Sequence, residues 1–258
     1  MKKNIIFLAI LLSVMVSIGC AKKKEMVIGK GTINGMVGNV TIKERGKTHQ
    51  AKVGDFVAVG MTIETGTKSL VEIYFGENII RVLENTTLFI NKFELNIATD
   101  SEQTELNLQI GEVFSKINKK LTKGDSYQIR TPTTIAGVRG TEFGVLERDG
   151  ITKVTCISGK VVVTSLSLQK EKKEPDFVEI SANEEVQVLQ DQPLEVRPLS
   201  EKDKKRMEDI FSNIGSPNPE LEKENVEEEK KEDVDSQTKK PQRPKRVREK
   251  GKAQKEEL

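Results

Sequence analysis

The chain has 258 residues, of which 35% are hydrophobic and 32% charged, and it contains no tryptophan. This composition and a mean hydropathy of −0.47 describe a soluble body that is not packed core throughout, most economically one domain with a tail. The formal net charge of +2 includes Lys2 and Lys3, so loss of a leader would leave the side chains without net charge, and net basicity indicates no particular partner.

The N-terminus has the pattern of an export signal. Lys2 and Lys3 precede an apolar run over residues 5–18, which is shorter than the about 20 residues that a membrane-spanning helix needs. We therefore expect a signal peptide over residues 1–19. Gly19 directly before Cys20 is similar to a bacterial lipobox, so Cys20 is expected to become the first mature residue and to carry acyl chains, including palmitate, that attach it to the membrane. The alternative is a free thiol in an uncleaved anchor.

Residues 20–32 are expected to form the lipidated N-terminus and a polar tether. Its lysines at 22–24 are either solvated or touch anionic head groups. From about Val27 onward, short alternating runs separated by turn residues recur about every 8 to 12 residues, which is typical of β-sandwiches and β-repeat folds. Parity along these runs predicts a core containing Ile73, Phe75, Val82, Leu88, Ile90, Ile110, Val113, Ile129, Val145, Val154, Ile157 and Val162.

A turn-rich segment at residues 131–145 interrupts this β-pattern. Pro132 favours an extended approach, and glycines at 137, 140 and 144 permit sharp bends or close packing. Such small residues leave little room for a catalytic pocket. The segment supplies the candidate interaction residues Thr131, Pro132, Gly137, Arg139, Gly140, Thr141, Glu142 and Phe143.

Arg139 and Glu142 have opposite charges three residues apart in this bend. Buried or half-buried charges are usually paired, which favours an ion pair within the protein. Contact with a partner remains the alternative.

The elements after residue 150 are predicted from turn and capping residues. Residues 152–163 have the pattern of strand, Ser-Gly turn and strand, while 178–180 and 186–188 have the pattern of a last hairpin. Ser200 is a plausible N-cap for a short helix over residues 199–215, with Asp203 three positions later.

The tail, residues 216–258, is highly charged and is expected to be disordered. It is acidic up to Asp235 and basic over Lys239–Lys252. The basic part either contacts an anionic cell-wall polymer or glycolipid or is merely solvated, and export argues against nucleic acid as a partner.

Few residues offer reactive chemistry. His49 is the only histidine, so neither imidazole catalysis nor a zinc site is expected. With Cys20 lipidated, Cys156 would be the remaining cysteine, and it is predicted to be a small buried apolar residue. No carboxylate pair or phosphate loop stands out. We expect no enzyme activity, no metal and no cofactor.

Three blocks of the chain resemble the FecR protein family of bacterial envelope proteins. Residues 53–75 carry a Gly-Asp turn, a Thr-Gly turn and a Ser-bearing strand in the family's order, and residues 108–130 lead into the segment 131–145, which is similar to the family signature. The strands of residues 152–163 close the resemblance, which spans roughly 33–190. It implies an all-β FecR-like domain of short stacked strands, solenoid-like or sandwich-like, over residues 33–198.

The best-known members of this family are signal transducers with a cytoplasmic anti-sigma segment, a membrane helix and a periplasmic domain that meets an outer-membrane transporter. Only Met1–Asn4 precede the apolar run here, so direct control of a sigma factor is not the leading expectation. We expect a lipid-anchored envelope protein that binds another envelope component for sensing, assembly or scaffolding. The alternatives are a tether to the cell wall or glycolipid through the tail, and a FecR-type sigma regulator. Residues 21 and 22 offer no aspartate after Cys20, which favours the outer membrane and its periplasmic face.

Overall fold

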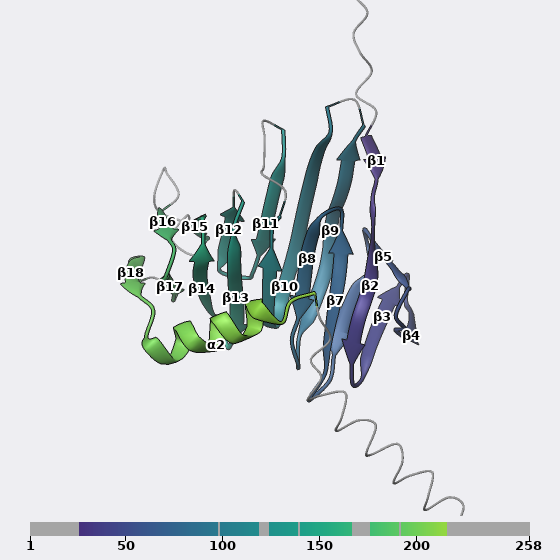
Figure 1. Ribbon diagram of the computed structural model, residues 1–258, viewed down its shortest axis with the longest axis horizontal. Helices are drawn as coiled ribbons and strands as arrows, with labels where there is room; N and C mark the ends of the chain where they lie inside the picture. Colours follow the sequence, from purple (N-terminus) through teal and green to yellow (C-terminus); the bar gives the residue numbers. More distant parts are fainter. Residues whose placement is uncertain are drawn as a thin grey trace, which may run out of the picture. The chain divides into compact units, whose positions relative to one another are not determined.

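The structure is a computed structural model that describes residues 26–97, 99–118, 124–138, 140–166, 176–190 and 192–215 (Figure 1). Cys20, Arg139 and the predicted tail of residues 216–258 lie outside the described residues. The first strand begins at Met26, so β-structure starts inside the segment 20–32 that the sequence assigns to the tether.

The described residues are mostly in β-strands. In chain order these are β1 (Met26–Ile28), β2 (Lys30–Val37), β3 (Val40–Glu44), β4 (Lys47–Gln50), β5 (Phe56–Ala58), β6 (Thr62–Thr65), β7 (Leu70–Phe75), β8 (Asn78–Val82), β9 (Thr87–Asn96), β10 (Ser101–Lys116), β11 (Ser126–Arg130), β12 (Thr134–Val138), β13 (Glu142–Arg148), β14 (Ile151–Ser158), β15 (Lys160–Ser165), β16 (Phe177–Ser181), β17 (Glu184–Val188) and β18 (Glu195–Pro198). A short helix, α2 (Glu201–Ser212), follows the last strand.

The strands form two sheets that pack face to face. Sheet A has the order β4-β3-β6-β9-β10-β11-β12-β15-β16, with β1 also beside β9. Sheet B has the order β5-β2-β7-β8-β10-β13-β14-β17-β18. The strand arrangement is not closed, and the strands follow the chain from one end of each sheet to the other (Figure 1). The predicted all-β fold of stacked short strands with a C-terminal helix is therefore confirmed.

Strand β10 belongs to both sheets. Its first part pairs with β9 and β11 in sheet A, and its last part, from Gly111, pairs with β13 and β8 in sheet B. Gly111 has φ 102°, and a Cβ there would lie 2.5 Å from the Cα of Thr86, so only glycine fits this crossing. A register shift between Leu108 and Ile110 turns Ile110 outward. The prediction that Ile110 lies in the core is wrong, because this side chain is 46% exposed.

Two predicted strand pairs are connections between the sheets. The Ser158-Gly159 turn joins β14 in sheet B to β15 in sheet A. The turn at residues 182–183 joins β16 in sheet A to β17 in sheet B, so the predicted last hairpin is wrong. Each strand instead pairs with a strand of its own sheet, because the apolar sides of Ile180 and Val186 face the core from opposite layers.

The core between the sheets contains most of the residues that parity predicts. Buried as predicted are Ile73, Phe75, Val82, Leu88, Ile90, Val113, Ile129, Val145 and Val154. Val162 is 40% exposed, since its neighbours Val161 and Val163 point inward. Ile157 is half-buried against α2 outside the sandwich, not between the sheets. These two core predictions are wrong.

Cys156 is fully buried, as predicted for a small apolar residue. Burial raises the pKa of its thiol to about 12, because the thiolate would lose its hydration. In a Cys20→Ser chain, we expect the thiol to be inert to Ellman's reagent at pH 8 and to react fully in guanidinium chloride. Reaction of the native protein at the rate of a free thiol would contradict this burial.

Candidate functional site

The start of the 131–145 segment is fixed by a buried cluster of hydroxyl groups. Thr152 Oγ1 donates to Glu147 Oε2 at 2.5 Å, so it accepts from the hydroxyls of Thr131 at 2.7 Å and Thr133 at 2.8 Å. Glu147 is 2% exposed and also accepts the N–H of Gly150 at 3.1 Å. The cluster holds the corner at Pro132, which is exposed, against the turn between β13 and β14. This part of the segment stabilises the fold.

The far end of the segment is largely buried as well. Thr141 Oγ1 donates to the carbonyl of Lys160 at 3.0 Å. Phe143 is fully buried and meets Tyr127 edge to face, with ring centroids 6.0 Å apart. Glu142 is paired within the protein, with Lys116 Nζ at 3.1 Å. Thr131, Thr141 and Phe143 therefore cannot contact a partner in this state.

The accessible part of the segment lies on the outer face of sheet A. An open hollow of about 840 Å³ lies over this face, between β11, β12, β15 and β16. Gly137 leaves the backbone of β12 uncovered there, and a Cβ at this position would meet nothing closer than the Val162 carbonyl at 4.0 Å. The Lys160–Glu179 ion pair, with an N···O distance of 2.5 Å, lies on the same face. The hollow's lining residues are Asp125, Ser126, Tyr127, Gln128, Gly137, Val138, Gly159, Lys160, Val162 and Glu179.

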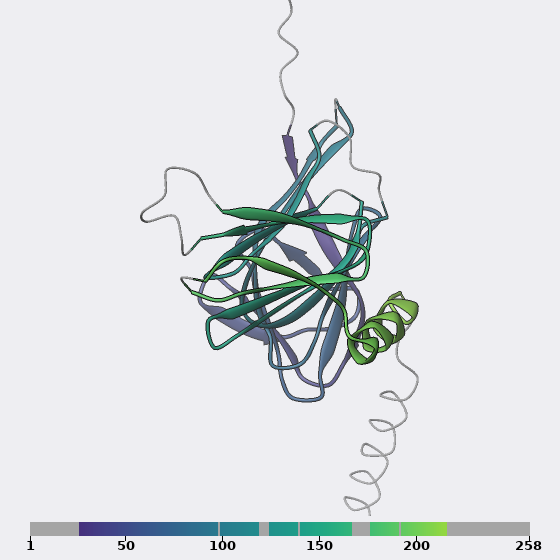
Figure 2. The same ribbon diagram turned by 90° about the vertical axis from the view of Figure 1, so that its left-hand side faces the viewer.

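Helix α2 covers part of the outer face of sheet B (Figure 2). Ser200 is its N-cap as predicted, since the side chain accepts the N–H of Asp203 at 3.1 Å. Phe211 meets Phe114 edge to face at 5.6 Å. A Cβ on Gly144 would lie 2.6 Å from the Phe114 ring, so this glycine of the 131–145 segment makes room for the ring that supports the helix.

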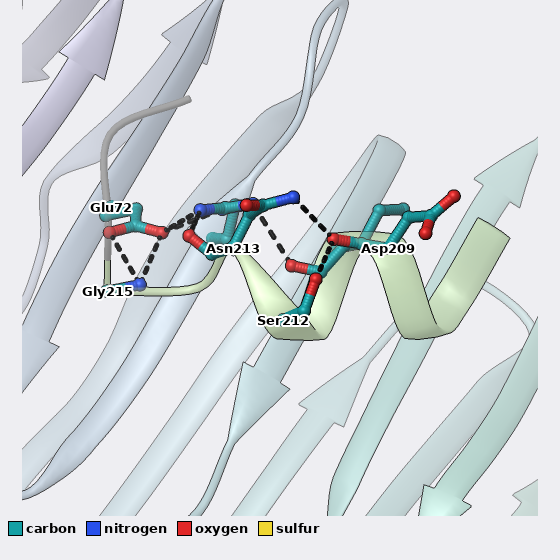
Figure 3. Close-up of polar contacts among 7 residues, drawn as sticks. Glu72, Asp209, Ser212, Asn213 and Gly215 are labelled. Atoms are coloured by element: carbon teal, nitrogen blue, oxygen red, sulfur yellow. Dashed lines mark hydrogen bonds and ion pairs between the residues drawn. The ribbon is translucent and has the colours of Figure 1, made fainter. Parts of the chain in front are cut away.

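The C-terminal end of α2 is held by a buried ion pair of the sheet (Figure 3). Glu72 of β7 and Arg81 of β8 are cross-strand neighbours, and Arg81 Nε donates to Glu72 Oε1 at 2.7 Å. Arg81 also donates to the carbonyls of Ile210, at 3.2 Å, and Asn213, while Glu72 accepts the N–H of Gly215 at 3.1 Å. We call these five residues the helix clamp.

The helix clamp places a positive charge at the C-terminal end of α2. The last turn of α2 contains no basic residue, and a helix C-terminus carries partial negative charge. Arg81 supplies the compensating cation from the sheet. The side chains of Arg81 and Glu72 are only 5% and 4% exposed, so each charge depends on the other and on the docked helix.

A smaller cavity, of about 330 Å³, lies between the N-terminal half of α2 and sheet B. The Arg206 guanidinium donates two hydrogen bonds to the Glu112 carboxylate, of 2.9 and 2.5 Å. Lys153 Nζ lies 3.6 Å from Asp203 Oδ2. The hydrogen bond from the Ser200 hydroxyl, assisted by the charge of Lys153, lowers the pKa of Asp203. These ion pairs hold the N-terminal half of α2 on sheet B.

The residues that could serve catalysis or metal binding lie apart from one another in the described part of the chain. His49 lies on the exposed strand β4 opposite Ile42. Within the described ranges, no three His, Cys, Asp or Glu side chains are placed to hold a metal ion. The helix that the structure describes is not long and apolar enough to cross a membrane. The hollow and the cavity offer surfaces for binding.

Residues 61–162 match the family model described as FecR protein. The match runs from the start of β6 into β15 and includes the whole 131–145 segment. The chain thus carries a FecR domain, as the sequence resemblance predicted.

Two crystal structures of a proposed anti-sigma factor from Parabacteroides distasonis ATCC 8503 are similar to the chain. Both are 17% identical to it, with TM-scores of 0.40 and 0.41, and the alignments cover 54% of this chain. The chain spans 60% of the length of those chains, and similarity at this level carries no functional argument. No curated protein matches the chain significantly.

Proposed function

We propose that the protein is a non-enzymatic, lipid-anchored protein of the cell envelope whose FecR domain binds another envelope protein for sensing, assembly or scaffolding. The observation that carries this proposal is the hollow on the outer face of sheet A beside the family segment. It is lined by Gly137 and Val138 of that segment, while the rest of the segment is mostly occupied in holding the fold.

An adjacent feature supports binding of an extended partner. Among the described residues, strand β16 lies at the edge of sheet A and pairs with β15 on one side, so its other side can accept an added strand. Phe177, at the start of β16, is 63% exposed. Main-chain pairing with β16 and side-chain contacts in the hollow together fit recognition of a β-strand.

The anchor and the location are part of the same proposal. Cys20 would carry the lipid, and the outer membrane facing the periplasm would be its location. The first described strand begins six residues after Cys20, so the domain would lie close to the membrane to which the lipid attaches. Mass spectrometry of the mature N-terminus tests the lipid directly.

Site-specific photo-crosslinking in cells tests the binding surface. A photoreactive residue at Val162, in the hollow, is expected to capture one membrane protein, identified by mass spectrometry. Val196 of β18 is the matched control, because the two side chains are 40% and 39% exposed and lie in different sheets. The full chain and a chain ending at Pro219 should give equal capture at Val162. Equal capture from Val162 and Val196 would contradict a site in the hollow.

Two other functions would give different results in these experiments. Capture of cell-wall or glycolipid material only by the full chain would identify a tether that works through Lys239–Lys252. The FecR match also favours a regulator of sigma-factor signalling as a candidate. A mature chain that begins at acylated Cys20 would exclude that regulator in the form with a retained cytoplasmic N-terminus.

A further inference from the structure

Exposed apolar side chains gather around β5, the edge strand of sheet B, and at the end of β1, the strand of sheet A that leads into β2. The most exposed are Ile28 at 67%, Val53 at 62% and Phe56 at 60%, and Val59 is 41% exposed. Lys30 and Lys52 are exposed among them. We call these six residues the β5 rim.

The strand register places the rim residues on one surface. Lys30 pairs with Ala58 and Thr32 with Phe56, which puts the start of β2 directly beside β5. Gly31 and its partner Val57 are buried, so Lys30 and Phe56 share the outward face of sheet B. Ile28 lies two residues before Lys30, in β1, where it pairs with Glu94 of β9 in sheet A. Lys30 Nζ lies 5.7 Å from the centre of the Phe56 ring. Val53 and Val59 lie in the turns that flank β5.

The rim combines apolar tips with lysines, and the two acidic residues beside it have partners. Glu94, opposite Ile28, lies 4.0 Å from Lys92 Nζ. Asp55 lies in the same turn as Val53, and its carboxylate accepts the backbone N–H of Lys52 at 2.9 Å. Apolar side chains mixed with lysines are the composition of surfaces that enter the boundary between lipid head groups and acyl chains. Lysines near an anionic bilayer add electrostatic attraction.

We propose that the β5 rim rests on the membrane surface and orients the domain there. This inference rests on the proposed lipidation of Cys20. Met26 lies six positions after Cys20, which allows at most about 20 Å of extended chain, so a lipid on Cys20 would hold the rim within reach of the bilayer. The anchor makes the contact intramolecular, so a shallow insertion that is weak by itself is sufficient.

A surrogate anchor tests the rim whether or not Cys20 is lipidated. A hexahistidine tag replaces residues 1–20 of the full chain and binds vesicles of phosphatidylcholine and phosphatidylglycerol that contain a nickel-chelating lipid. The environment-sensitive dye NBD is attached to a Val59→Cys variant or, as control, to a Phe177→Cys variant. Cys156 does not interfere, because it is fully buried. Phe177 serves as the control because it is even more exposed, at 63% against 41% for Val59, but lies on β16 at the other end of the strand order.

We expect a severalfold rise and a blue shift of NBD emission at position 59 on vesicle binding, and no change at position 177. Adding Ile28→Asp and Phe56→Asp should abolish the rise at position 59 without changing the unfolding temperature, because both side chains are exposed. No rise at position 59, or equal rises at both positions, would overturn the proposal. A rise that depends on protein concentration without vesicles would also overturn it and assign the rim to contact between copies of the chain. If Cys20 proves unlipidated, only the proposed anchor fails, since the surrogate measures the rim alone.

Discussion

Replacing Arg81 by alanine is expected to lower the free energy of unfolding by about 3–5 kcal/mol, because Glu72 would remain as an unpaired charge beneath α2. The loss is smaller if the helix lifts and lets water reach Glu72. In that case the amide protons of α2 should exchange with solvent much faster than those of β13 beneath it. Urea unfolding followed by circular dichroism, combined with hydrogen exchange, measures both effects.

Two controls separate the helix clamp from general charge effects. Lys43→Ala removes an ion pair with Glu64 in which both side chains are substantially exposed, so its cost should be about 0–1 kcal/mol. A double variant, Glu72→Met with Arg81→Met, leaves no lone buried charge and should be more stable than Arg81→Ala. An Arg81→Ala protein with unchanged stability and unchanged protection of α2 would show that Arg81 does not hold the helix.

Gly111→Ala is expected to cost about 3 kcal/mol or more, because it combines two separate penalties. The residue has φ 102°, which side chains rarely adopt, and its new Cβ would lie 2.5 Å from the Cα of Thr86. Since β10 continues through both sheets, the strain cannot be relieved without shifting one of them.

Gly54→Ala is the matched control for the backbone penalty alone. Gly54 has φ 91°, and a Cβ there would meet no atom within 4 Å, so about 1–2 kcal/mol is expected. Thermal or urea unfolding of both variants gives the comparison. Equal losses for the two would contradict a clash at the crossing of β10.

Local patterns were sufficient to predict the all-β fold, the N-cap of α2 at Ser200 and the burial of Cys156. Side-chain alternation wrongly predicted Ile110 as a core residue, because a register shift changes the face of the sheet on which it lies. The turn residues gave a wrong hairpin at residues 182–183, because a turn that crosses between sheets has the same local sequence signals as a hairpin. Only the partners of β16 and β17 distinguish the two, and these lie in β15 and β14.

The contacts that hold α2 could not be predicted from the sequence. Arg81 and Ile210 are 129 positions apart, and neither has a local signal that indicates the other. The sequence predicts that the 131–145 segment contacts a partner, but only part of the segment is accessible in the structure. Thr131, Thr141 and Phe143 are buried, whereas Gly137 lines the hollow. A missing basic residue in the last turn of α2 was the one available hint that a cation comes from elsewhere.

The position of the helix clamp has a mechanical consequence. Helix α2 follows β18, at the end of sheet B, yet its last residues bind β7 and β8, which belong to the first half of the chain. A pulling force applied at residue 215 would reach the Glu72–Gly215 and Arg81–Asn213 hydrogen bonds before any strand pair. These few contacts would break one after another and release α2 while the strands stayed paired, so the helix would give way under tension before the β-domain does.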